Sequence, residues 1–301
     1  MYVADLHSDS LLTVNAEKGL ISEYNTSKKY PFLQCFAAWT AAAGHPMEAR
    51  RKLVMQRLNV YAYECERLGL TKIEDVRGLY YATDNALPSA MFTIEGGGGL
   101  LADSDELFTF YKAGLRIMGF AWDTNELATG AYDECDNGLT DEGIRMARRC
   151  AELGITVDVS HLSDKSFYDL MRYYPLPVIA THSNFRDVCN SKRNLTADMA
   201  REIVARGGVI GLNLYPDFIK EENARIEDVI PHIEYHLEHF GEDYLSFGFD
   251  IDGTFGKNLI GLNPEISIHD QLIDLLLSRY PSRTVEKIAG ENVINFLKGV
   301  L

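Results

Sequence analysis

The chain has 301 residues, 46% of them hydrophobic, and a formal net charge of −15 at pH 7. This acidic balance argues against nucleic acid or an anionic membrane surface as a partner, since both favour an excess of Lys and Arg. Five widely spaced cysteines without a CxxC pair, no leader-like start and no apolar stretch of ~20 residues predict a cytoplasmic protein whose thiols are reduced and buried.

Short apolar runs rich in β-branched residues alternate along the chain with longer segments of helical spacing. The runs predict eight strands, at 2–7, 33–39, 90–95, 115–122, 155–161, 177–182, 208–214 and 245–250. Between them, segment 140–154 is typical of a helix, because Thr140 can cap its start and Gly154 can end it. The segment 292–301 predicts a last, packed helix.

Eight strands alternating with helices predict an α/β fold, because parallel neighbours need a helical crossover. Eight is the number of strands that closes a (β/α)8 TIM-type barrel, and we expect one such domain over residues 1–301. The alternative is an open, doubly wound sheet. That fold would normally carry a Gly-rich phosphate loop after the first strand, where this chain has HSDS, so the barrel is favoured.

Ionisable side chains stand at the carboxyl ends of five predicted strands. They are His7, Asp9, Glu95, His161, His182 and Asp250. In a barrel these strand ends converge on one face, where active sites are built. Imidazoles and carboxylates suit zinc and similar divalent ions, and a bridging carboxylate would suit two ions that activate a shared water.

Each of these residues also has an ordinary interpretation, because a histidine at a strand end is often a hydrogen-bonded loop residue. His232, His236 and His239 recur at i, i+4 and i+7 of one predicted helix, and we expect a solvated helix face there. His269 falls in a polar stretch. The coincidence of six such residues at strand ends favours a metal site for that set alone.

Around these residues the sequence resembles the membrane (renal) dipeptidase family, metallopeptidase family M19, over nearly its whole length. The most specific match is IEGGGGLLADSDELFTFYKAGLR at 94–116. Further matches are HSD at 7–9, DVSH at 158–161, THSNFRDVCNSKRNL at 181–195 and GFDIDG at 248–253.

The resemblance implies two zinc ions per chain. His7 and Asp9 would bind one ion, His161 and His182 would bind the other, and Glu95 would bridge the two. The implied activity is hydrolysis of dipeptides that carry a free C-terminal carboxylate, L-D dipeptides included, by a metal-bridging hydroxide. A small dipeptide is therefore the expected partner, and the resemblance also implies a homodimer.

The resemblance further implies roles for residues around the metals. Asp250 would accept and donate the proton, Arg193 would bind the terminal carboxylate of the substrate, and Asn194 would support it. A guanidinium suits that role because it pairs with a carboxylate through two hydrogen bonds.

One position departs from the family pattern. Better-known members carry a histidine after the fourth strand that helps bind or polarise the substrate carbonyl, and here the alignment places Trp122. An indole donates one hydrogen bond but neither ligates metal nor carries a proton. Two alternatives stay open: a related barrel metallohydrolase acting on another amide or ester, and a non-catalytic metal-binding protein. The second is disfavoured because the whole ligand set and Arg193 are present.

Overall fold

The computed structural model describes residues 1–12, 26–42, 45–100, 105–252 and 258–301. Its centre is a parallel sheet in the order β6-β5-β4-β2-β1-β8-β7. The strands of this path are β1 (Val3–Asp5), β2 (Phe32–Trp39), β4 (Ser89–Glu95), β5 (Ile117–Gly119), β6 (Thr156–Asp158), β7 (Ile210–Leu212) and β8 (Leu245–Phe247). Because β1 pairs with both β2 and β8, the first strand joins the two ends of the chain within one sheet.

The eighth barrel position is filled by the segment 177–182, which forms single bridges instead of a long ladder. Ile179 pairs with Asp158 of β6, and Ala180 pairs with Ile210 of β7, so this segment closes the ring between these two strands. The predicted α/β barrel is therefore confirmed. A short strand that the sequence analysis did not predict, β3 (Thr71–Lys72), pairs with β4 outside the ring.

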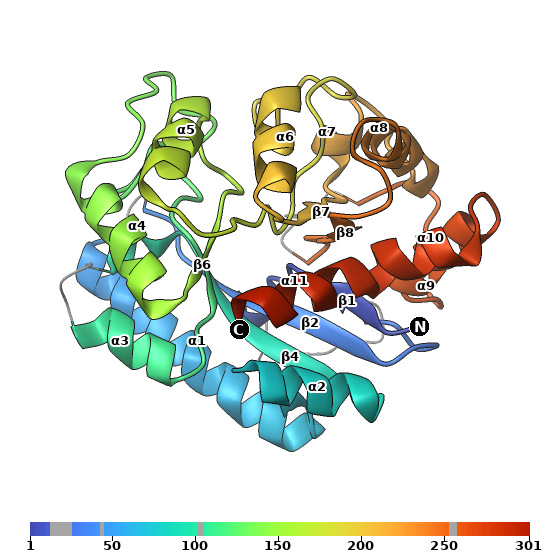
Figure 1. Ribbon diagram of the computed structural model, residues 1–301, viewed down its shortest axis with the longest axis horizontal. Coiled ribbons are helices and arrows are strands. Elements are labelled where there is room, and N and C mark those ends of the chain that lie inside the picture. Colours follow the sequence, from blue (N-terminus) through green and yellow to red (C-terminus); the bar gives the residue numbers. More distant parts are fainter. Residues whose placement is uncertain (13–25, 43–44, 101–104, 253–257) are drawn as a thin grey trace.

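Helices surround the strands (Figure 1). They are α1 (Met47–Leu68), α2 (Val76–Asp84), α3 (Asp105–Lys112), α4 (Asp141–Leu153), α5 (Asp164–Tyr173), α6 (Ala197–Ala205), α7 (Pro216–Ile219), α8 (Ile230–Phe240), α9 (Ile268–Leu277), α10 (Ser282–Glu286) and α11 (Asn292–Val300). The described residues also form the 3-10 helices η1 (Ser10–Leu12), η2 (Gly97–Gly99) and η3 (Ile226–Val229) and the π-helical segment η4 (Lys287–Glu291).

The helix ends follow the local chemistry of the sequence. Helix α4 begins after Thr140, whose side chain accepts a hydrogen bond from the Gly143 amide, and it ends at Gly154 with a positive φ of 72°. The predicted C-terminal helix is confirmed as α11, which buries Val293 and Leu297. In the part of the chain that the structure describes, no helix is both long and apolar enough to cross a membrane.

Two expectations about which side chains are buried are wrong. His232 and His236 of α8 are fully buried, and of the three histidines on that helix His239 alone is exposed. The buried pair is tolerated because each ring bonds to the backbone, His232 Nε2 to the Ile219 carbonyl at 3.1 Å and His236 Nε2 to the Asp243 carbonyl at 2.8 Å. All five cysteines are free, but Cys135 is exposed instead of buried, since it lies in the loop before α4.

Close packing at the barrel seam holds the segment that carries His182. A Cβ atom on Gly211 or Gly248 would lie only 2.1 or 1.7 Å from the Thr181 carbonyl oxygen. Glycine is thus needed at Gly211 within β7 and at Gly248 directly after β8, where the backbone passes this carbonyl, and the chain next to His182 has little room to move.

Candidate active site

The structure brings the six predicted strand-end residues together at the carboxyl face of the barrel. His7 and Asp9 follow β1, Glu95 ends β4, and His161 follows β6. His182 ends the closing segment, and Asp250 follows β8. Four of the six side chains are buried, and those of His161 and Asp250 are partly exposed.

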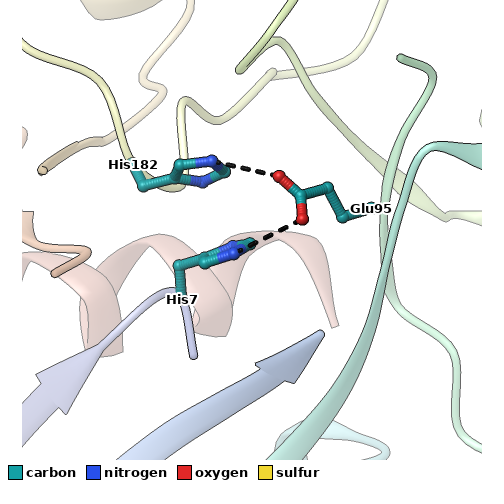
Figure 2. A group of neighbouring side chains, drawn as sticks. All are labelled: His7, Glu95 and His182. Atoms are coloured by element: carbon teal, nitrogen blue, oxygen red, sulfur yellow. Dashed lines mark ion pairs between the residues drawn. The ribbon is translucent and has the colours of Figure 1, made fainter. Parts of the chain in front are cut away.

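Glu95 lies between two groups of ligand atoms. Its Oε1 is 2.8 Å from Nε2 of His161 and 3.3 Å from Nε2 of His182. Its Oε2 is 3.7 Å from Nε2 of His7. Figure 2 shows the two carboxylate oxygens turned toward different histidines, His182 and His7.

A second carboxylate pair completes the group around His7. Nε2 of His7 lies 3.8 Å from Oδ1 of Asp9 and 3.9 Å from Oδ1 of Asp250. Two overlapping groups, one of His7, Glu95 and His182 and the other of His7, Asp9 and Asp250, have the spacing that can hold a metal ion.

Three buried atoms at this point have no hydrogen-bond partner within the described residues: Nε2 of His7, Oδ1 of Asp9 and Oε2 of Glu95. Leaving such atoms unpaired is costly, each by about 1–3 kcal/mol, and they converge on one another. A divalent cation between them would satisfy all three. The donor set and this convergence therefore fit a metal centre.

The protonation states of these histidines and carboxylates also fit a metal centre. Burial lowers the pKa of His7 to about 3 and holds the pKa of His161 and His182 well below the usual range, so these imidazoles are neutral and carry lone pairs. Burial, together with repulsion between neighbouring carboxylates, raises the pKa of Asp9 and Glu95 well above the usual range. A bound cation would remove that repulsion.

Two of the six residues have a left-handed backbone, His161 with φ 67° and Asp250 with φ 56°. This conformation costs a non-glycine residue about 1–2 kcal/mol, and such strain is often stored at functional sites. Burial raises the pKa of Asp250 to about 7, opposed by Arg193 and by a hydrogen bond from Asn213.

Two carboxylates to which the sequence analysis gave no role, Asp5, which is buried, and Asp252, which is half-buried, brace the strand ends. Asp5 accepts hydrogen bonds from the amides of His7 and Phe249 and lies 2.7 Å from Nε2 of His269, which is buried although it falls in a polar stretch of the sequence. Asp252 accepts from the amide of Asp9. The available signal was an aspartate inside an apolar run, two residues from a predicted ligand and so on the same strand face.

The three predicted substrate-binding residues lie at different depths. Arg193 is 3% exposed, and its Nη1 and Nη2 donate to Ser183 Oγ and the His182 carbonyl, each at 2.8 Å. Asn194 is buried and donates to the carbonyls of Cys189 and Phe218, so it shapes the loop around Arg193.

Trp122 lines the mouth of the site. Its ring lies 6.2 Å from that of His161 and meets the ring of Trp39 edge-on at 5.1 Å. The space in front of these rings is a cavity of about 640 Å³ that reaches Asp9, Glu95 and Asp250.

The wall of this cavity is aromatic and acidic. Its remaining lining residues are Asp123, Thr124, Gly130, Tyr132, Asp133, His161, Tyr215, Asp217 and Phe218. Among the described lining residues there is no Lys or Arg. The cavity therefore offers flat apolar faces and a negative potential to whatever enters it.

Known proteins share this architecture. A structure of a metallopeptidase from Rhodobacter sphaeroides, liganded with a phosphinate mimic of the dipeptide L-Ala-D-Ala, superposes with a TM-score of 0.87 at 22% identity, covering 100% of this chain and 99% of that one. A structure of a dipeptidase of family M19 gives a TM-score of 0.85 at 23% identity, covering 100% and 98%. At these identities the likeness supports the fold.

The alignments with sequence relatives span a smaller share of each relative than the structural superpositions do. An uncharacterized protein of Klebsiella pneumoniae is 32% identical over 69% of this chain and 80% of its own. The dipeptidase tcpJ of Claviceps purpurea is 28% identical over 76% of this chain but only 54% of its own length. The model of the membrane dipeptidase family matches residues 7–300. The chain therefore belongs to the membrane dipeptidase family, peptidase family M19, and is a metallopeptidase, a hydrolase of peptide bonds.

Proposed function

We propose that this protein is a binuclear zinc dipeptidase that hydrolyses dipeptides with a free C-terminal carboxylate, L-D dipeptides included. The observation that carries this proposal is the placement of Glu95, whose two oxygens face different histidines. A carboxylate placed this way can bridge two ions.

His7 and Asp9 would hold one ion, His161 and His182 the other, and Glu95 both. When bound, the two ions would lower the pKa of a water held between them and polarise the scissile carbonyl. Because His161 and His182 are neutral, each ring has one nitrogen with a lone pair that could serve this purpose.

Asp250 would take the proton of the attacking water and pass it to the leaving amine. Its Oδ1 faces Nε2 of His7, and its Oδ2 accepts from Asn213 at 3.1 Å, so the carboxylate is held at the edge of the metal group. This mechanism needs no Ser or Cys nucleophile. The buried Ser160 has a structural contact instead, because its Oγ accepts a hydrogen bond from the amide of His182.

Arg193 would bind the terminal carboxylate of the dipeptide. Two of its nitrogens already bond to the protein, which fixes the guanidinium plane, and its buried Nε has no partner among the described residues. Trp122 and Trp39 would form the apolar wall beside the scissile bond.

A second candidate is hydrolysis of another amide or ester by the same centre. The observation that favours it is Trp122, which occupies the cavity wall where better-known family members place a histidine. Without that hydrogen-bond donor, a substrate with a more reactive carbonyl would be hydrolysed faster relative to a peptide.

Two measurements test these proposals. Metal analysis of the purified protein should give close to two divalent ions per chain, and a metal-free protein that stays active would contradict the metal centre. A zinc-supplemented panel of L-L and L-D dipeptides, N-acyl amino acids and lactones separates the two candidates. Turnover of dipeptides above the others supports the first, and the reverse order supports the second.

A further inference from the structure

A chain of three buried groups leads away from the proposed metal centre behind His182. Thr181 Oγ1 donates to Oδ2 of Asp158 at 2.6 Å. The same hydroxyl oxygen lies 2.7 Å from Nδ1 of His182. Asp158 and Thr181 are 4% and 2% exposed, so water does not compete for these bonds.

The direction of the hydrogen bonds follows from counting protons. The hydroxyl of Thr181 has one proton, and it goes to the Asp158 carboxylate. The contact with His182 therefore needs a donor, and only the imidazole can supply it, through Nδ1–H. A neutral imidazole protonated at Nδ1 presents a lone pair at Nε2, the atom that lies 3.3 Å from Glu95 Oε1.

We infer that Asp158 and Thr181 are positioning residues that hold His182 in the one tautomer able to bind metal. The inference deepens the proposed function and depends on its metal centre. An outer carboxylate that reaches a metal-binding histidine through hydrogen bonds also raises the basicity of that ligand.

The backbone at this place does not depend on the Thr181 hydroxyl. The amides of Ser160 and Thr181 both donate to Oδ1 of Asp158, at 2.9 Å each, and the amide of Gly211 donates to the Ala180 carbonyl at 2.7 Å. Replacing Thr181 by Val keeps the volume and these bonds and removes the hydroxyl alone.

The substitution Asp158→Asn should reverse the relay. Its amide oxygen would keep the two backbone donors, and its NH2 group would donate to Thr181. The Thr181 hydroxyl would then donate to Nδ1 of His182, which moves the imidazole proton to Nε2 and blocks the lone pair.

The test measures zinc release from the zinc-loaded full chain to a chromogenic chelator. In Thr181→Val, we expect one of two ions to bind about 10- to 100-fold more weakly, while the ion at His7 and Asp9 keeps its affinity. Asp158→Asn should weaken the same ion, and Thr181→Ser should restore wild-type release. The matched control is Thr284→Val, which removes a similar buried hydroxyl that donates to Glu242 at 2.7 Å in another part of the fold.

Each outcome decides a different point. If the wild type retains no zinc, the metal centre itself is wrong. If the wild type holds two ions and both Thr181→Val and Asp158→Asn release them like the wild type, the relay is wrong. Failure of Thr181→Ser to restore binding would assign a packing role to Thr181. If Thr181→Val does not fold, Asp158→Asn, checked by circular dichroism, carries the test.

Discussion

Asn213 orients Asp250 by a single hydrogen bond, from Nδ2 to Oδ2, of 3.1 Å. The other oxygen of Asp250 is left facing His7. We expect Asp250→Asn to lower kcat by about 10²- to 10⁴-fold, because an amide of the same shape cannot accept the proton. Zinc content should stay close to that of the wild type, since the five proposed ligands remain.

Asn213→Ala is the companion variant for this prediction. It leaves the carboxylate of Asp250 in place but removes the group that orients it, so its loss of kcat should be smaller than that of Asp250→Asn. Full activity in Asp250→Asn would remove Asp250 from the proton transfer.

Glu95→Gln should reduce zinc binding below two ions per chain and abolish activity. The amide has one oxygen and a donor in place of the second oxygen, so it cannot bridge two cations. Elemental analysis and kcat are the readouts. Glu64→Gln is the control, because Glu64 is also buried but pairs with Arg67 at 2.7 Å, away from the site. Two tightly bound ions in Glu95→Gln would contradict the bridging role.

Arg193→Lys should raise KM for dipeptides by about 10- to 100-fold, which corresponds to losing a charge-assisted hydrogen bond of about 1.5–3 kcal/mol. Lysine keeps the charge but cannot reproduce the planar fork that holds Ser183 and the His182 carbonyl. The matched substrates are the same dipeptides with a C-terminal amide. Their KM should change little, and an equal loss on both classes would exclude carboxylate recognition by Arg193.

The acidic cavity should favour substrates that carry an additional positive charge. Asp123, Asp133 and Asp217 line it, and no Lys or Arg does so among the described lining residues. We expect kcat/KM to be higher for dipeptides with a Lys side chain than for those with Glu, and the ratio to fall at high salt. Asp133→Asn should reduce the ratio. If the ratio changes neither with salt concentration nor in Asp133→Asn, electrostatic selection by the cavity is contradicted.

Much of this architecture could be predicted from the sequence, because each barrel strand is a short apolar run and each proposed ligand stands at its end. The apolar pattern of 177–182 predicts the closing segment even though, in the described structure, it pairs through single bridges at Ile179 and Ala180. What could not be predicted depends on contacts across the barrel. Asp158 braces Thr181, 23 residues away, and Asp5 reaches His269, 264 residues away, and no local pattern reports such pairs.

The same limit explains the misjudged helix α8. The spacing of His232 and His236 places them on one helix face but does not reveal whether that face is exposed to solvent. In the structure the face packs against Phe185, whose ring lies 6.3 and 5.8 Å from the two imidazoles. The depth of Arg193 was equally hidden, because a sequence motif names a residue without giving its exposure.

These buried imidazoles predict a loss of stability in acid. Burial lowers the pKa of His236 to about 4, whereas an unfolded chain has about 6.5, so the unfolded state binds more protons between these pH values. Stability from this group is complete above pH ~6.5 and is lost as pH falls toward ~4. At pH 5 the loss should be about 2 kcal/mol.

His236→Gln isolates this contribution. In the wild type, Nε2 lies 2.8 Å from the Asp243 carbonyl and Nδ1 has no partner among the described residues, so a glutamine amide can keep the one hydrogen bond without titrating. Urea unfolding should give similar free energies for both proteins at pH 7.5. At pH 5 the variant should be the more stable, by about 2 kcal/mol. Parallel pH profiles would mean that His236 titrates alike in both states and is accessible to protons in the folded protein.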